Sequence, residues 1–519
     1  MSNERPECLR RQLIADALAG CSLVNLLYIE VWQLLFAAKT ADAFYLTVRP
    51  LHYVAALLTV LAGGALTAIA GQFVRRSPRP VQYPLRIAFI ASALVFLNKV
   101  RTSTEITLAD ILQHVMPVLH AIGKPGMAVV ALVIALLVVR FAFPLSRAYR
   151  VVLLVFSPFV VYTLVRSSWM LATVDFAQFH DVTPTTRTPM ATASRVVVVL
   201  LDELDYESLY LTRPKDLALP NFDALRLQAV SFDSIVTPGA NTLESVSSFF
   251  LQRRVDWFEP TGTRSFVAHL SDGGTLRSDT AEYLLTQPAL AGTRIGIIGF
   301  ALPYCRMPFA VAAEQCDWMP VGNAVWPSGD GDGFGTVVLR QVESLHPYDY
   351  RRTHIRRLRR MLDKSVQFAS DSSLSLVLLH LSLPHAPFIW DRNTDEFRDD
   401  ITSPDGYFGN LALADRFLGR LREEMIKSGT WSTSTVVVMS DHAERTKLSE
   451  KRSMDRRVPL FVKLPGMQAG LRVSDPLNSL FVAFVLPDLL SGRVRDAADL
   501  RNRALDYTHL HHSLLQLPK

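Results

Sequence analysis

The sequence contains little cysteine. Its 519 residues include four cysteines, with no CxxC pair and no spacing typical of a zinc finger, which excludes a cysteine-based zinc site. Internal repeats and long low-complexity tracts are also missing. Cys305 and Cys316 are close enough in sequence to form a local disulfide in an oxidising compartment, although two free thiols remain the alternative. Cys8 and Cys21 lie far from this pair in the sequence, in its apolar N-terminal part.

A large excess of charge is missing as well. The formal net charge is only +6, and many arginines flank apolar segments instead of forming one basic cluster. This distribution indicates membrane topology and argues against nucleic-acid binding.

Hydrophobic residues make up 49% of the chain, and they are concentrated before residue 175. Runs of about 20 apolar residues match the thickness of a bilayer core. We expect an N-terminal bundle of about five transmembrane helices within residues 1–171. The expected spans are 12–37, 51–74, 84–99, 126–143 and 149–171, of which the third and fourth are short.

The first apolar run is long, has no clear small-x-small cleavage site and is followed by further apolar runs, so we expect it to be retained. Arginines are most frequent before span one, between spans two and three, and between spans four and five. The positive-inside rule then places the N-terminus in the cytoplasm. Five crossings place the rest of the chain outside, as expected for a multi-pass protein of a bacterial-type inner membrane.

A Thr- and Pro-rich linker, 172–194, precedes a globular domain, 195–519. Short aliphatic runs alternate there with amphipathic segments, which predicts an α/β fold with a mainly parallel sheet covered by helices on both faces. The expected strands are 195–201, 294–300, 374–380, 435–439 and 458–463. The expected helices are 221–229, 243–252, 355–369 and 407–428.

Two of these strands end in groups that bind metals. Val196–Leu201 is followed by Asp202 and Glu203, and the run ending at Met439 is followed shortly by Asp441 and His442. Ligands of open α/β sheets bind at the carboxyl ends of strands, and a metal ion keeps neighbouring carboxylates ionised. The alternative is two core strands followed by solvated or helix-capping residues.

Thr242 follows three small or turn-forming residues and precedes an expected helix, a position suited to a phosphate or sulfate group. The common role of threonine there is to cap the helix. In HLSLPHAPF, two prolines hold His385 in a rigid turn where it could protonate a leaving group. His380, in the preceding strand, is expected to be structural or to support its neighbours.

The order of these motifs resembles the sulfatase-like branch of the alkaline phosphatase superfamily, in particular membrane-bound phosphoglycerol and phosphoethanolamine transferases such as lipoteichoic acid synthases. The phrases YFGNLALADRFLGRLREEM and RRVPLFVKLPG add to the likeness, which covers residues 195 to about 465. The resemblance implies an alkaline-phosphatase-like α/β sandwich domain outside the membrane.

The resemblance also implies the site. One divalent metal ion is held by Glu203 with Asp202 and by Asp441 and His442, while Thr242 is both nucleophile and metal ligand. His385 contacts the transferred group, and we assign His380, Asn241 and Lys447 to substrate binding. Zn²⁺ or Mn²⁺ suits such a mixture of carboxylates and imidazole.

The sequence departs from the family pattern in three places. Thr242 begins TLES where sulfatases carry C/S-x-P-x-R, which disfavours sulfate-ester hydrolysis. SDHAE stands for the common SDHGE, and the usual downstream histidine is missing, with Arg445, Lys447 or Arg457 as its possible replacement.

The expected function is transfer, or hydrolysis, of a phospho-alcohol group from a membrane lipid donor to an envelope glycan acceptor. The alternatives are a phosphodiesterase or monoesterase, a catalytically inactive binding or assembly protein, and, from the spans alone, a transporter.

Overall fold

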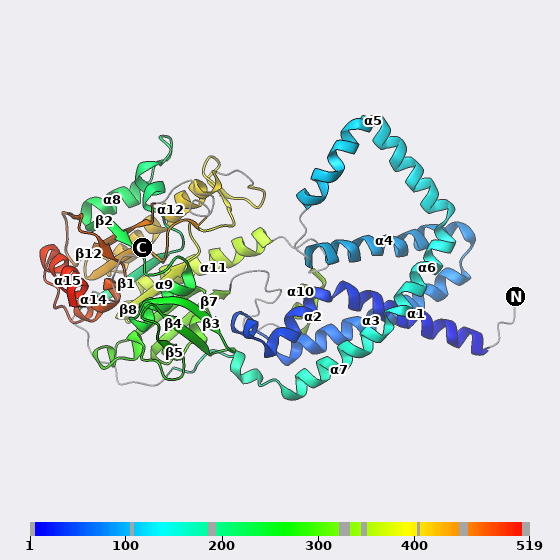
Figure 1. Cartoon of the computed structure of the whole chain (residues 1–519), viewed down its shortest axis with the longest axis horizontal. Helices are drawn as coiled ribbons and strands as arrows, with labels where there is room; N and C mark the ends of the chain where they lie inside the picture. The colour runs from blue at the N-terminus through cyan, green and yellow to red at the C-terminus, as the bar shows by residue number, and fades with distance from the viewer. Residues whose placement is uncertain are drawn as a thin grey trace. The chain divides into compact units, whose positions relative to one another are not determined.

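The computed structural model describes residues 6–103, 108–184, 194–320, 333–343, 350–401, 405–445 and 455–510. These residues form two compact units (Figure 1). The helical unit comprises Met1–Lys39, Thr47–Ala177 and Ala324–Tyr348. The α/β unit comprises Thr40–Leu46, Gln178–Asn323 and Asp349–Lys519. Each unit therefore includes a short segment taken from the middle of the other unit's sequence.

The helical unit is built from long apolar helices with exposed aliphatic side chains. Its helices are α1 (Pro6–Leu27), α2 (Ile29–Phe36), α3 (Pro50–Arg76), α4 (Arg79–Ser103), α5 (Leu108–Arg140), α6 (Ala142–Val155), α7 (Ser157–Thr173) and α10 (Phe334–Glu343). A bilayer would remove these side chains from water, which explains why they need no cover from protein.

The described residues contain three or four candidate membrane spans, so the expected number of about five is not confirmed. Three segments of the described chain are long and apolar enough, namely Pro50–Arg76, Arg79–Asn98 and Ala142–Thr173. A fourth candidate is the pair Glu7–Leu27 and Ile29–Lys39, which bends by 66°. The expected span 126–143 corresponds to the apolar helix Pro125–Arg140. This helix is shorter than the roughly 20 residues that cross a bilayer core.

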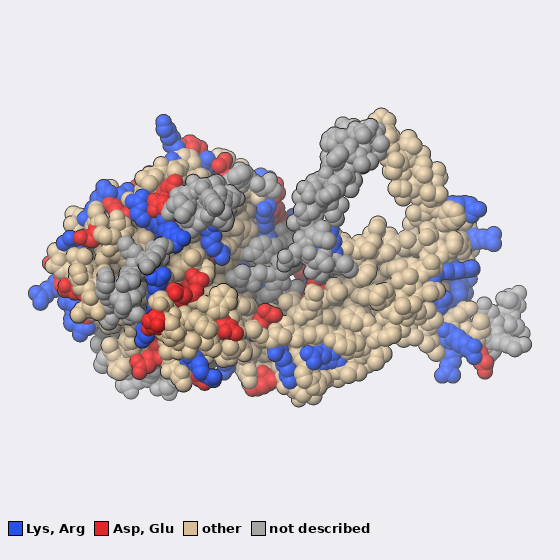
Figure 2. Space-filling view, viewed as in Figure 1, with Lys and Arg blue, Asp and Glu red and all other residues tan. Residues whose placement is uncertain are grey.

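Charged side chains of the helical unit are concentrated at one end. Figure 2 shows Lys and Arg gathered at the end near the N-terminus, followed by a long surface with few charges. Asp16 of α1 pairs with two of the arginines of this unit, Arg75 and Arg150. Such a division between a basic end and an apolar flank is typical of a helix bundle with one cytoplasmic face.

The α/β unit is organised around one nine-stranded sheet of order β13-β2-β12-β11-β1-β8-β6-β7, with β14 pairing to β2. Its strands are β1 (Arg195–Leu201), β2 (Val230–Val236), β6 (Ile295–Ala301), β7 (Ala313–Pro320), β8 (Leu376–Leu381), β11 (Ser434–Ser440), β12 (Arg457–Lys463), β13 (Leu471–Val473) and β14 (Leu477–Asn478). Among these described strands, β12 alone runs antiparallel to its neighbours. The mainly parallel sheet expected from the sequence is therefore confirmed.

Both faces of the sheet are buried. Val196 and Val198 of β1 belong to one apolar core, and Val197 and Val199 belong to the other. The first core is covered by α9 (Thr242–Leu251), α14 (Phe481–Leu490) and α15 (Ala497–Leu510). The second is covered by α8 (Pro220–Gln228), α11 (Tyr350–Ser370) and α12 (Gly406–Lys427). A continuous aliphatic run is the pattern that burial on two sides requires.

The five expected strands and four expected helices all exist. The strands β2, β7, β13 and β14 of the main sheet and the helices α10, α14 and α15 were not expected. A second, antiparallel sheet, formed by β3 (Val255–Pro260), β4 (Phe266–Leu270) and β5 (Thr275–Arg277), was not expected either. The remaining short pair is β9 (Trp390–Asp391) with β10 (Glu396–Phe397). The disulfide between Cys305 and Cys316 is confirmed, with Cα atoms 5.6 Å apart.

One segment of the α/β unit comes from the N-terminal part of the chain. The short helix η2 (Ala41–Tyr45) places Phe44 in the first core, against Phe258. The guanidinium of Arg306, which is 1% exposed, donates to the backbone oxygens of Phe44 at 2.7 Å and Leu46 at 2.8 Å. These bonds explain how a charged side chain can be buried there.

Candidate functional site

The site forms at the carboxyl ends of three neighbouring strands. β1 lies between β11 and β8, and all three are parallel. Asp202 follows β1, Asp441 follows β11, and His380 lies on β8 opposite Leu200. Parallel strands end at the same edge of a sheet, so residues far apart in sequence meet there.

Asp441 is at the centre of the site and is 2% exposed. Its Oδ2 accepts a hydrogen bond of 2.8 Å from the hydroxyl of Thr242. Its Oδ1 accepts from the backbone N–H groups of His442 at 2.8 Å and Glu203 at 3.2 Å. Burial alone would raise the pKa of Asp441, but the neighbouring His442 and His380 and the Thr242 hydroxyl hold it below its usual value. The carboxylate is therefore ionised.

Thr242 is the first residue of α9, and its hydroxyl is free for the site. The residue that caps the helix is Asn241, whose side-chain oxygen accepts from the N–H of Glu244 at 3.1 Å. Interpreting Thr242 as the cap is therefore wrong, because Asn241 already satisfies the orphan N–H group. The side-chain nitrogen of Asn241 donates to Glu244 at 2.7 Å. Both the oxygen and the nitrogen of the Asn241 side chain therefore form hydrogen bonds at the start of α9.

His442 supplies the positive charge nearest to the buried acids. Its Nε2 lies 3.3 Å from Oδ1 of Asp202 and 3.3 Å from Oγ1 of Thr242, and its Nδ1–H donates to the carbonyl of Ala443 at 2.9 Å. Burial lowers the pKa of this imidazole, but the charges of Asp441 and Asp202 outweigh it and raise the pKa to about 9. Two buried carboxylates therefore favour the binding of a cation beside them.

A divalent metal ion fits this donor set. One ligand atom each of Asp202, His380 and Asp441 lies within 4.8 Å of the others, and all three residues are buried. Oδ1 of Asp202 and Nε2 of His380 are buried and have no hydrogen-bond partner among the described residues. The nearest polar neighbours of these two atoms are charged groups, Nε2 of His442 at 3.3 Å from Asp202 and Oδ2 of Asp441 at 3.7 Å from His380. Buried polar atoms are almost always hydrogen-bonded, so two ligand atoms that lack such a bond favour a bound cation.

Glu203 lies in a second, outer group. Its carboxylate accepts from Nε of Arg445 at 3.0 Å, and Nε2 of His385 lies 3.9 Å from the same oxygen. Arg445 also contacts His385 at 2.9 Å. Glu203 has a φ of 64°, in the left-handed region that is costly for a residue with a side chain.

The turn that carries His385 is held by α12. The side-chain nitrogen of Asn410, which is fully buried, donates to the carbonyls of Pro384, His385 and Pro387 at 3.3, 3.0 and 3.1 Å. Its side-chain oxygen accepts from the N–H of Ile389 at 3.0 Å. One side chain therefore fixes the shape of the whole turn.

Apart from Asn241, whose side chain is hydrogen-bonded to Glu244 at the start of α9, and Lys447, the predicted site residues fall into two neighbouring groups. The inner group contains Asp202, Thr242, His380, Asp441 and His442, and the outer group contains Glu203 and His385 together with Arg445. Lys447 lies outside the described residues. Of the two arginines considered as substitutes for a downstream histidine, Arg445 is in the outer group, whereas Arg457 pairs with Asp455.

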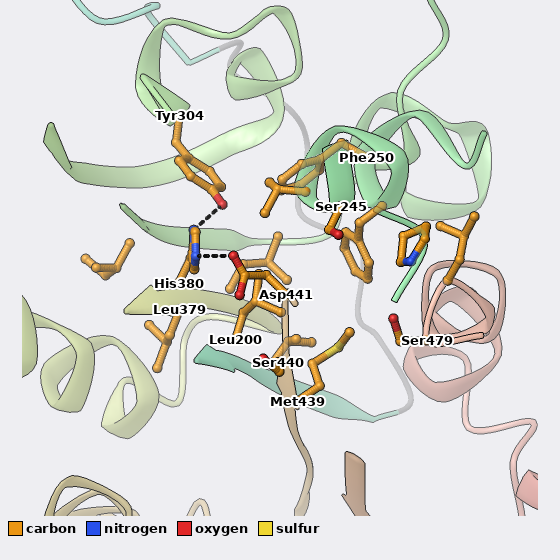
Figure 3. A pocket seen from close by; sticks show the side chains of 17 residues that line it. Leu200, Ser245, Phe250, Tyr304, Leu379, His380, Met439, Ser440, Asp441 and Ser479 are labelled. Atoms are coloured by element: carbon orange, nitrogen blue, oxygen red, sulfur yellow. Dashed lines mark hydrogen bonds and ion pairs between the residues drawn. The ribbon is translucent and has the colours of Figure 1, made fainter. Parts of the chain in front are cut away.

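Tyr304 is a site residue that the sequence did not reveal. It follows β6 in the turn η7 (Tyr304–Arg306), and its hydroxyl lies 2.8 Å from Nδ1 of His380. Nε2 of His380 lies 3.7 Å from Oδ2 of Asp441, so the three side chains form a row (Figure 3). Burial raises the pKa of Tyr304 well above its ordinary value, which keeps the phenol neutral. Its position after a third buried strand was the available signal.

Gly299 makes room for the Tyr304 ring. A Cβ at this position would lie 2.1 Å from a ring carbon of Tyr304. The position of an alanine Cβ is fixed by the backbone and could not avoid this overlap. Glycine is therefore required where the Tyr304 ring packs on the strand. The placement of the phenol is therefore encoded on two neighbouring segments.

Tyr304→Phe tests whether the phenol orients His380. With the hydroxyl present, Nδ1–H can donate to it, which leaves Nε2 free to bind a cation. We expect Tyr304→Phe to weaken zinc affinity by about 10- to 100-fold, the usual effect of removing a group that supports a metal ligand. Zinc affinity is measured on the full-length protein by competition with a chelator.

Tyr283→Phe is the matched control. Tyr283 is 4% exposed in the same core, and its hydroxyl donates to the carbonyl of Ser278 at 2.8 Å, remote from the site. Each variant loses one buried hydrogen bond, worth about 1 kcal/mol of stability. An equal loss of zinc affinity in both variants would reduce Tyr304 to a packing residue.

A cavity borders the cluster on the side of α9. Its volume is about 40 Å³, and its lining is mainly apolar, from α9 and from strands β1, β6, β8 and β11. His380 and Asp441 form part of its wall (Figure 3). An apolar wall lowers the local dielectric constant and strengthens the interactions of the charged groups beside it.

Several solved structures are similar to the chain. Ps i-CgsB has a TM-score of 0.41 and 16% identity, over 59% of this chain and 74% of that one. The lipoteichoic acid synthase LtaP from Listeria monocytogenes has a TM-score of 0.37 and 17% identity, over 58% and 72%. The phosphonate monoester hydrolase of Agrobacterium radiobacter has a TM-score of 0.37 and 15% identity, over 57% and 73%. No curated protein matches the sequence.

One protein family matches more than half of the chain. The family described as Sulfatase matches residues 194–491, which begins one residue before β1 and ends just after α14. The matched segment contains all the residues of the inner and outer groups. Because it spans more than half of the 519 residues, the chain belongs to the sulfatase family.

Proposed function

We propose that the protein is a membrane-anchored, metal-dependent enzyme that transfers or hydrolyses a phospho-alcohol group, with Thr242 as the nucleophile. The observation that carries this proposal is the hydrogen bond of 2.8 Å between the Thr242 hydroxyl and Asp441, inside a buried acidic cluster. A hydroxyl that donates to an ionised carboxylate is prepared to lose its proton.

The residues suggest a two-step reaction. Oγ1 of Thr242 forms a bond to phosphorus, the bond from phosphorus to the donor alcohol breaks, and the hydroxyl proton passes to Asp441. His385 protonates the departing alcohol oxygen. In the second step the oxygen of an acceptor hydroxyl, or of water, forms a bond to phosphorus and the bond from phosphorus to Oγ1 of Thr242 breaks. The proton of the acceptor passes to His385, and Asp441 returns its proton to Oγ1 of Thr242.

Asp202, His380 and Asp441 would hold the metal ion, with His442 and Thr242 beside them. When bound, the ion lowers the pKa of the nucleophile and neutralises phosphoryl oxygens. Zn²⁺ or Mn²⁺ suits carboxylate and imidazole ligands together. The backbone N–H groups at the start of α9 and the guanidinium of Arg445 add positive potential for an anionic substrate.

The apolar helices favour a lipid donor. We propose phosphatidylglycerol or phosphatidylethanolamine as donor, an envelope glycan as acceptor, and a bacterial-type inner membrane with about five spans as location. The basic end of the helical unit supports this orientation, with the α/β unit outside the cytoplasm. The Cys305–Cys316 disulfide agrees with an oxidising compartment.

A second candidate is a catalytically inactive protein that binds or assembles envelope components. The pairing of Glu203 with Arg445 favours it, because a carboxylate implied as a metal ligand is engaged elsewhere. A phosphodiesterase that releases its product to water is the hydrolytic form of the main proposal.

The test uses the full-length protein in lipid nanodiscs that contain labelled phosphatidylglycerol or phosphatidylethanolamine. We expect release of diacylglycerol that stops when a chelator removes the metal and resumes when Zn²⁺ or Mn²⁺ is added. The preferred lipid identifies the donor. If the protein binds the metal but neither releases diacylglycerol nor transfers a group from either lipid, the inactive protein is favoured.

A further inference from the structure

Helix α10 lies within the segment matched by the sulfatase family, yet it belongs to the helical unit. It packs against α3. Val337 is 2% exposed and Gln341 is fully buried, and the side-chain nitrogen of Gln341 donates to the carbonyl of His52 at 2.9 Å. One side of α10 is thus covered by the unit.

A further apolar part of α10 is left uncovered. Phe334, Leu339 and Val342 are 42%, 58% and 39% exposed. At 3.6 residues per turn, Phe334 and Val342 continue the apolar side that begins at Val337, and Leu339 lies at its edge. The opposite side of the helix carries Thr336, Arg340 and Glu343. The apolar side of α10 is therefore wider than the part that α3 buries, and the helix is amphipathic.

The position of α10 along α3 indicates what covers this apolar side. Gln341 bonds near the beginning of α3, at His52, whereas the opposite end of α3 carries Arg75 and Arg76. Between these ends, α3 exposes aliphatic side chains such as Leu58 and Leu61, at 47% and 58%. The exposed apolar side of α10 thus adjoins the end of an apolar flank that fits a bilayer, opposite the basic end.

We propose that α10 lies in the membrane interface on the extracytoplasmic side, with Phe334, Leu339 and Val342 in the outer part of the lipid and Arg340 toward the headgroups. This proposal rests on the membrane anchoring proposed above. Large apolar side chains on one side and polar residues on the other are the pattern of helices that lie flat in an interface. The occupant is a lipid surface, because α10 packs at the beginning of α3, a helix whose exposed aliphatic side chains fit a bilayer.

The test measures the surroundings of single nitroxide labels in the full-length protein, reconstituted in bilayers of phosphatidylethanolamine and phosphatidylglycerol. Cys8 and Cys21 are first replaced by serine and alanine, and the disulfide is kept. Labels are attached after Phe334→Cys and, on the opposite side of the helix, after Thr336→Cys. Leu61→Cys on α3 reports whether the helical unit is in the membrane.

We expect the label at position 334 to collide with oxygen, which concentrates in lipid, several-fold more than with a water-soluble nickel complex. The label at position 336 should show the opposite preference. Lipid exposure at position 61 with water exposure at position 334 would overturn the proposal for α10 alone. Low access of both reagents at position 334 would also overturn it, because protein would then cover the helix. Water exposure at position 61 would overturn the membrane anchoring itself.

Discussion

Thr242→Ala is expected to abolish turnover and the covalent adduct. Removing a nucleophile that acts together with its neighbours costs about 10⁴- to 10⁶-fold in rate in comparable enzymes. Here the hydroxyl lies 2.8 Å from Asp441 and 3.3 Å from His442, and alanine leaves this position without an oxygen. Intact-mass analysis after incubation with lipid donors measures the adduct, and diacylglycerol release measures the rate.

Two further variants separate chemistry from folding. Thr242→Ser keeps a hydroxyl and should retain a measurable adduct. Thr237→Val removes another buried hydroxyl from the same loop, one that donates to the carbonyl of Gly239 at 2.9 Å. It should change stability but leave the adduct in place. An adduct that survives in Thr242→Ala would assign the nucleophile to a different residue.

Asp441→Asn is expected to remove metal binding. The asparagine can still accept the two backbone hydrogen bonds that reach Oδ1, but it lacks the charge that attracts a cation. We expect metal affinity to fall by at least about 100-fold, more than the usual loss of a supporting group. The wild-type protein should gain thermal stability when Zn²⁺ or Mn²⁺ is added, because a ligand of the folded state stabilises it. The variant should not.

Asp415→Asn is the matched control for this change. Asp415 is also a buried carboxylate, but on α12, where it accepts from the N–H groups of Asn221 at 3.0 Å and Phe222 at 2.8 Å. Its loss should lower the melting temperature without changing metal content. If Asp441→Asn keeps the metal-dependent gain in melting temperature, the inner group is not the metal site.

The strands that the sequence predicts best are those buried on both faces. Val196–Leu201 and Val436–Met439 are unbroken aliphatic runs, which in a chain of this kind have few other uses than a central strand. β2, with sequence VSFDSIV, was missed because Ser231, Asp233 and Ser234 interrupt the run. Asp233 is explained only by the folded protein, where it pairs with Arg226 and Arg472 from other segments.

The site was predictable where the strand ends determined it. Asp202 and Asp441 meet because β1 and β11 are parallel neighbours. The sequence predicts that both strands are buried and end in ligands, whereas their adjacency is seen only in the fold. The separation of Asp202 from Glu203 could not be foreseen, because it depends on the left-handed backbone of Glu203 and on Arg445. The contact of His380 with Tyr304 depends on the order of β8 and β6 in the sheet, which no local pattern encodes.

The exchange of segments between the two units affects how the protein can be produced and dissected. A soluble fragment that starts at the family match would lack η2, and the guanidinium of Arg306 would lose the carbonyls of Phe44 and Leu46. During synthesis, η2 leaves the ribosome before any strand of the sheet. Phe44 can therefore be buried only after the later residues of the α/β core, such as Phe258, have been made. The α/β unit therefore cannot complete its core as an independent fragment, and the helices before it are part of its folding requirement.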